Sequence, residues 1–106
     1  MLAKSLQAPY YAVVFISTKS DDLEGYQEYD ELTLKLAQEQ PGFLGYENTG
    51  DGKNGIFISY WASLADIENW RKHPIHLEAK ARAHQWYSYY HSQICLVENS
   101  RTFDSR

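Results

Sequence analysis

The sequence has little cysteine and no long apolar run. Cys95 is the single cysteine among 106 residues, so no disulfide can form within the chain, and zinc-finger spacing is absent. The longest apolar run, residues 10–16, is too short to cross a bilayer, and residues 1–9 lack the apolar stretch of a signal peptide. We therefore expect a cytoplasmic protein in a reducing compartment, without a membrane partner.

The chain also lacks an excess of basic residues. Ten Lys and Arg stand against 14 Asp and Glu, a net charge of −4, which argues against nucleic acid as a partner. Internal repeats and flexible linkers are absent, so we expect one domain over residues 1–106, with a core at about 9–101 and flexible ends. Aromatic residues are plentiful at 15%, more than a small core usually needs.

The order of apolar segments predicts four strands and two helical regions. Residues 10–17 are β-branched and aromatic, as in a strand. Ser20 or Asp21 is the expected cap of a first helix that ends before Pro41. Ser63 is the expected cap of a second helical region, which Pro74 should break near His73. The remaining expected segments are strands at 42–48, 56–61 and 87–98, a hairpin turn within 50–55, and a helical continuation over 74–85.

This β-α-β-β-α-β order predicts an α+β fold of the ferredoxin-like split βαβ type, with a four-stranded antiparallel sheet. Such a sheet normally leaves one face in water, and its strands alternate. In the segments at 10–17 and 56–61, the side chains expected on either face of the sheet are apolar, so both faces should be buried. A second copy of the chain would supply that cover, and we expect a homodimer with sheets packed face to face.

Four stretches resemble the antibiotic biosynthesis monooxygenase (ABM) family, in the dimeric α+β barrel superfamily. They are residues 40–45, 59–61, 67–76 and 86–90. One branch of that family oxidises aromatic phenols without metal or flavin, because the deprotonated substrate reduces O₂ directly. The other branch binds and degrades haem, and is similar to this chain at Trp70. It also uses a strand-one Asn, absent here, and a helix His where this chain has Lys80.

The resemblance and the spacing together single out six candidate residues. Trp70 and His73 are the candidate catalytic pair: they lie one helical step apart, and His73 can be either a helix cap or a base. The candidate substrate-binding residues are Tyr26, Tyr60, His76 and Lys80. Two histidines at 73 and 76 make only half a metal site, so we expect no metal. The sequence does not determine which alternate side chains of the expected strands face the helices, so it does not say whether Tyr46 or Tyr60 does.

The charges divide between the helices, acidic over 21–39 and basic over 71–84. Either the helices attract each other and carry solvated faces, or the basic region receives an anion. The resemblance implies a cofactor-independent monooxygenase that oxidises a small aromatic or phenolic ligand with O₂. The alternatives are a haem-binding and haem-degrading monooxygenase and a non-catalytic dimer that binds a hydrophobic anion.

Overall fold

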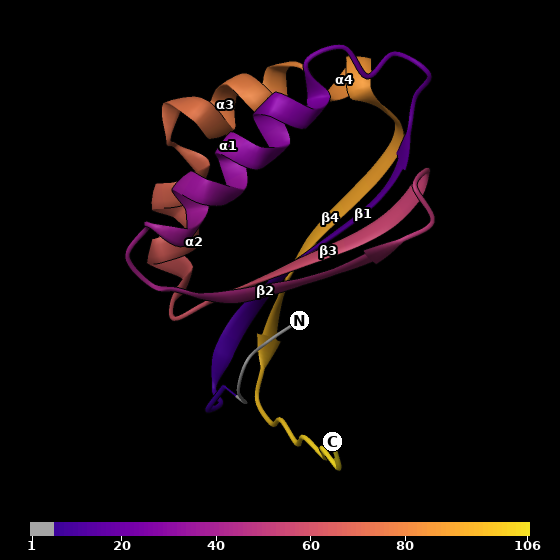
Figure 1. The fold of residues 1–106 in the computed structure, drawn as a ribbon. Helices are drawn as coiled ribbons and strands as arrows, with labels where there is room; N and C mark the ends of the chain where they lie inside the picture. Colours follow the sequence, from indigo (N-terminus) through magenta and orange to yellow (C-terminus); the bar gives the residue numbers. More distant parts are fainter. Residues whose placement is uncertain (1–5) are drawn as a thin grey trace.

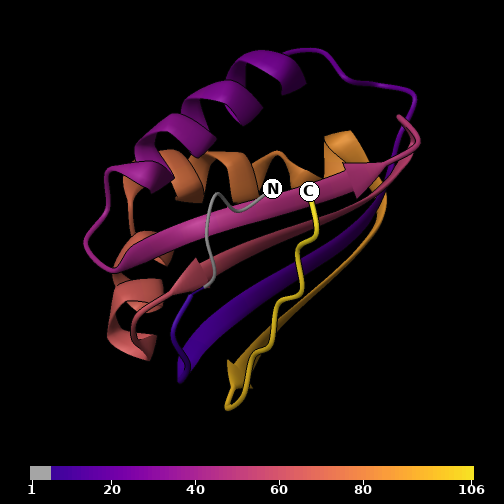
Figure 2. The ribbon, with the colours of Figure 1, turned by 60° about the horizontal axis from the view of Figure 1, so that its bottom comes forward.

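A computed structural model describes residues 6–106 as one antiparallel sheet with helices on one side (Figures 1 and 2). The sheet order is β2-β3-β1-β4, which confirms the ferredoxin-like α+β fold. The elements are β1 (Tyr10–Lys19), α1 (Tyr26–Gln38), β2 (Phe43–Gly50), β3 (Asn54–Trp61), α2 (Leu64–Arg71), α3 (Pro74–Ala81), α4 (Ala83–Trp86) and β4 (Tyr87–Val97). In the described part, no helix has the length and apolar character needed to span a membrane.

The core lies between the helices and one face of the sheet. Trp61, 1% exposed, packs there with Ile67 and Trp70 from α2 and with Ala37 from α1. Its indole N–H donates to the Ser59 hydroxyl at 2.9 Å, so the buried polar groups satisfy each other. Side chains alternate along a strand, so the register assigns every other residue to this face or to the opposite one.

An irregularity in β2 determines which of its side chains face the helices. Phe43 pairs with Trp61 while Gly45 pairs with Tyr60, so Leu44 is an extra residue in the ladder. Phe43 therefore packs on the core, and Tyr46, opposite Ser59, faces the helices as well. Tyr60 faces away from them.

The predicted cap at Ser20 or Asp21 is wrong, because α1 begins only at Tyr26, after Gly25. The Ser20 N–H donates to the Trp86 carbonyl at 2.7 Å, and the Ser20 hydroxyl donates to the Gln85 carbonyl. The Glu24 carbonyl accepts from the Arg82 guanidinium and from the Trp86 indole, both at 2.9 Å. Residues 20–24 are thus held against α4 and cannot join the helix. The residue that precedes α1 is therefore Gly25, whose backbone is in the left-handed region.

The second helical region follows the prediction at its start and departs from it at its end. The Ser63 hydroxyl accepts from the Asp66 N–H at 3.1 Å and caps α2 as expected. The break at His73 and Pro74 is confirmed. The expected continuation to residue 85 is interrupted at Arg82, which turns the chain so that Trp86 is buried at 3% exposure. The guanidinium of Arg82 then stacks on Trp86 at 4.7 Å.

Two glycines with similar backbone angles allow the packing of α2 to be tested. Gly42 has φ +82°, and a Cβ there would lie 2.0 Å from Asp66 Oδ2, at the start of α2. Gly52 has φ +94°, and a Cβ there would meet nothing within 4 Å. We expect Gly52→Ala to lower the free energy of unfolding by about 1 kcal/mol through backbone strain. Gly42→Ala adds overpacking and should cost about 3 kcal/mol in total.

Urea unfolding followed by tryptophan fluorescence measures both values. Equal destabilisation by the two substitutions would show that the contact between Gly42 and α2 contributes nothing beyond the backbone angle.

Candidate functional site

Trp70, His73 and His76 come together where α2 meets α3. The Trp70 ring centroid lies 5.3 Å from that of His73 and 5.4 Å from that of His76. Trp70 is 8% exposed and belongs to the core cluster. The structure therefore places both candidate catalytic residues, and the candidate substrate-binding His76, in one aromatic group.

His73 caps helix α3 with its side chain. Its Nδ1 accepts a hydrogen bond from the Ile75 N–H at 3.1 Å. An accepting Nδ1 carries no proton, so in the neutral imidazole the proton lies on Nε2. The cap therefore fixes the tautomer and makes Nε2–H a hydrogen-bond donor.

His76 is a half-buried imidazole with one unpartnered nitrogen among residues 6–106. Its Nδ1 is enclosed and has no hydrogen-bond partner within residues 6–106, while the ring hydrogen-bonds to the Arg71 backbone. Burial lowers the pKa of His76, and the positive charges of Arg71 and Lys80 lower it further. His76 is therefore neutral at pH 7, and its free Nδ1 lone pair is a potential proton acceptor.

A second polar group lies at the other end of the helical layer, where α1 begins. The rings of Tyr26 and Tyr87 meet edge to face, with their centroids 6.0 Å apart. Lys19 Nζ lies 5.4 Å from the Tyr26 ring centroid. Partial burial raises the pKa of the Asp30 carboxyl, and the Lys19 charge opposes that rise. Of these four residues, Tyr26 alone is a site candidate predicted from the sequence.

Burial is the main cause of the raised pKa of both tyrosines in this second group. Both phenols therefore keep their protons at neutral pH. Lys19 and Tyr87 are paired in the register of β1 and β4, beyond the end of the strand predicted over residues 10–17. Asp30 follows Tyr26 by one helical turn.

Two of the predicted substrate-binding residues lie apart from these groups. Tyr60 is on the opposite face of the sheet, where its hydroxyl donates to Glu47 at 3.2 Å and its ring packs on Tyr10. Burial and the Glu47 carboxylate raise the pKa of Tyr60 to about 12. Lys80 is exposed on α3, and its charge acts on His76. Tyr60 therefore shares no cavity with Trp70.

The acidic and basic helices lie side by side without an ion pair between them. Among residues 6–106 the salt bridges are Arg71–Glu68 and Arg106–Asp104. Helix α1 meets α3 instead through the Tyr29 hydroxyl, which donates to Glu78 at 2.9 Å. Arg82 lies 5.4 Å from the Tyr29 ring centroid.

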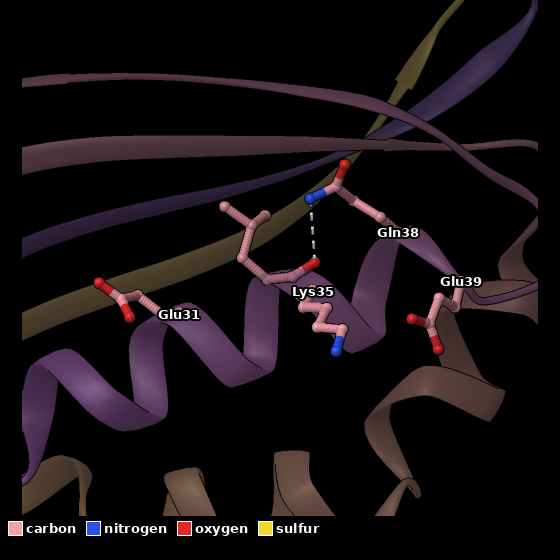
Figure 3. Close-up of a pocket in the computed structure, with 5 residues that line it drawn as sticks. Glu31, Lys35, Gln38 and Glu39 are labelled. Atoms are coloured by element: carbon pink, nitrogen blue, oxygen red, sulfur yellow. Dashed lines mark hydrogen bonds between the residues drawn. The ribbon is translucent and has the colours of Figure 1, made fainter.

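Two open depressions lie away from both groups. One, of about 400 Å³, runs along α1 and is lined by Glu31, Leu34, Lys35, Gln38 and Glu39 (Figure 3). The other, of about 390 Å³, lies at the β2–β3 hairpin on the face without helices and includes Ile16, Ile56 and Tyr89. No three His, Cys, Asp or Glu side chains gather as a metal site within residues 6–106.

The sheet order and the helices on one face define a small ferredoxin-like α+β domain, and comparison identifies the family. The chain belongs to the antibiotic biosynthesis monooxygenase family, whose model matches residues 9–82. It is 43% identical over 105 residues to the uncharacterized protein YqjZ of Bacillus subtilis, covering 96% of this chain and 91% of YqjZ.

Two solved structures share the fold at low sequence identity. SnoaB, a cofactor-independent oxygenase from Streptomyces nogalater, superposes with a TM-score of 0.69 at 15% identity, covering 90% of this chain and 97% of SnoaB. PA3566 from Pseudomonas aeruginosa superposes with a TM-score of 0.71 at 12% identity, covering 92% and 100%. At these identities the likeness concerns the fold.

The lowered pKa of His76 predicts a pH-dependent stability. Below about pH 6.5 the unfolded chain binds a proton at this residue that the folded chain does not bind. The free energy of unfolding should therefore fall as the pH drops from about 7.5 to about 6, above the range in which carboxylates titrate. His76→Gln should flatten this fall.

Urea titrations at several pH values measure the dependence. His84→Gln is the matched control, because His84 is exposed, and it should retain the wild-type slope. An unchanged slope in His76→Gln would contradict the assignment of a half-buried neutral imidazole.

Proposed function

We propose that the protein is a monooxygenase that oxidises a small aromatic or phenolic substrate with O₂ and needs no metal or flavin. The observation that carries the proposal is the group formed by Trp70, His73 and His76. It combines an indole, a donor whose tautomer is fixed by a helix cap, and a neutral half-buried imidazole with a nitrogen that is unpartnered among residues 6–106. The family and the SnoaB-like fold agree with this chemistry.

In this proposal each side chain has one task. The Trp70 ring packs against the flat substrate and excludes water. His76 is proposed to accept a proton from the acidic carbon of the substrate at Nδ1, which requires the substrate to displace the side chains that enclose this atom. A neutral imidazole is the form that can do so. The His73 Nε2–H donates to the substrate oxygen on which negative charge collects.

The electrons for oxygen come from the substrate itself. The carbanion left by proton transfer adds to O₂, one oxygen atom stays on that carbon as a carbonyl, and the other leaves as water. A methylene group and O₂ thus give a carbonyl and H₂O, so the balance needs no external reductant.

We expect the purified protein, freed of metal and flavin, to consume O₂ with an anthrone. His76→Gln should reduce the rate roughly 100-fold, the usual effect of losing a general base. Trp70→Phe should raise KM more than it lowers kcat, because it removes stacking area. His73→Asn keeps a side chain that can cap α3 but removes the ring donor, so it should lower kcat without loss of folding.

Oxygen-electrode rates and circular dichroism for each variant test these expectations, with His91→Gln as an exposed control. Full activity in both Trp70→Phe and His76→Gln would refute the site, and absence of O₂ uptake by the wild-type protein would refute the activity.

The two alternatives have different signatures. A non-catalytic binder would bind the anthrone without O₂ uptake. A haem-binding protein would shift the Soret band saturably on haemin titration at one haem per chain. The geometry gives haem no specific support, because the His73 Nδ1 is occupied by the cap.

We also propose that two chains pack through the sheet faces that carry no helix. That face presents Val14, Ile16, Ile56 and Ile58, which alternate with the core residues of their strands. Ile56 is 40% exposed in the single chain, and an apolar sheet face of this kind is typical of an interface.

Light scattering at micromolar concentration should give twice the chain mass of 12.3 kDa. Ile58→Glu should give the mass of one chain, because a charge at the centre of the interface is costly to bury. Leu77→Glu, on the exposed side of α3, should leave the dimer intact. A single-chain mass for the wild-type protein would contradict the proposal.

A further inference from the structure

The sheet face without helices is filled at one end and hollow at the other. Near the start of β1, the rings of Tyr10 and Tyr60 pack edge to face on it, and Tyr10 is buried. Near the end of β1, beside the β2–β3 hairpin, the same face carries the depression of about 390 Å³. An isologous contact between two such faces, with its two-fold axis across the strands, sets each filled end against a hollow end.

The depression has an apolar part and a polar rim whose groups are already hydrogen-bonded. Ile16 and Ile56 line the apolar part and are paired in the register of β1 and β3. On the rim, the Thr18 hydroxyl donates to Asn54 Oδ1 at 2.8 Å, and the Asn54 amide donates to Asp51 at 3.4 Å. Because these polar groups satisfy one another, the depression suits an apolar side chain better than a polar ligand.

The chain carries an exposed aromatic side chain on its C-terminal tail, residues 98–106, which follows β4 and contains no helix or strand. Phe103 on this tail is 87% exposed, more than any other large apolar residue of 6–106. The Tyr10 hydroxyl donates to the Ser100 hydroxyl at 3.4 Å, so the tail begins beside the start of β1. Figure 1 shows the tail continuing past the end of β4, away from the β2–β3 hairpin.

We propose that, in the dimer, the C-terminal tail of each chain docks on the second copy and inserts Phe103 into its hairpin depression. Val97 is paired with Tyr10, so the tail starts at the filled end of its own sheet, which the isologous contact sets over the hollow end of the partner. Ile56 lines the depression and also belongs to the proposed dimer face, so the two contacts are continuous. The inference rests on the dimer proposed above and is independent of the oxygenase activity.

The length of the tail favours the depression of the second copy over that of the same chain. From Tyr10 to Ile16 the strand advances about 20 Å. Residues 98–103 span about 20 Å at full extension. To fill its own depression, the tail would therefore have to run straight back over the apolar face, in the place that the second sheet takes.

Disulfide trapping tests the contact, in a background in which Cys95→Ser removes the native thiol. The test chain carries Phe103→Cys together with Thr49→Cys, because Thr49 lines the depression. On oxidation it should give a covalent species of twice the chain mass on a non-reducing denaturing gel. The matched control carries Phe103→Cys with Gln38→Cys on α1, and it should be trapped at least roughly tenfold more slowly.

The affinity of the dimer gives a second readout that needs no oxidation. Phe103→Ser should raise the dimer Kd at least roughly tenfold, because a buried aromatic anchor is lost from each copy. Phe103→Leu should raise it less, and Thr102→Ala, at the neighbouring exposed position, should leave it unchanged. Light scattering over a dilution series measures each Kd. Since Phe103 is exposed in the single chain, its substitutions should not alter the circular dichroism.

Equal trapping of the test and control pairs would overturn the inference and leave the dimer standing, as would an unchanged dimer Kd in Phe103→Ser. A disulfide formed within one chain, seen as a species of single-chain mass, would overturn it as well. A single-chain mass for the wild-type protein would overturn both the dimer and the docking. Trapping by the test pair, with no O₂ uptake by the wild type, would support the docking and refute only the oxygenase.

Discussion

Everything in this fold depends on the backbone pairing of β1, which, like β3, hydrogen-bonds on both sides along nearly its whole length. Its partners are β3 on one edge and β4 on the other, both antiparallel. A shift of one residue in either ladder would move Trp61, Tyr60 and Tyr87 to the wrong faces.

The sequence predicts what depends on local chemistry. Ser63 and Pro74 marked their helix boundaries correctly, because capping and the loss of an N–H act within a few residues. The predicted start of α1 was wrong because Ser20 hydrogen-bonds to Gln85, 65 residues away along the chain. Helix-capping preferences consider only neighbouring residues and do not anticipate such a partner. The face of Tyr60 stayed open because alternation fixes it only relative to its neighbour Trp61, and the sequence does not show which of the two packs against the helices.

The candidate site was found in part for the same reason. Trp70, His73 and His76 lie close together along the chain, so helical spacing predicted that they are neighbours, as they are in the structure. In the Tyr26 group, Tyr87 lies far in sequence from the other members, and the β1–β4 register brings it beside Lys19. His73 shows how a structural and a chemical role can coincide: the bond that caps α3 also decides which ring nitrogen carries the proton.

The joint between residues 20–24 and α4 has a consequence for how the sequence can vary. Arg82 and Trp86 both donate to the main-chain carbonyl of residue 24, not to its side chain. The acidic side chain of Glu24 is therefore free to be exchanged in evolution or design, whereas Arg82 and Trp86 are tied to each other by stacking and by a shared acceptor. Related chains in which residues 20–24 pack on α4 in this way should vary in residue type at position 24, whereas the residues at positions 82 and 86 should change together.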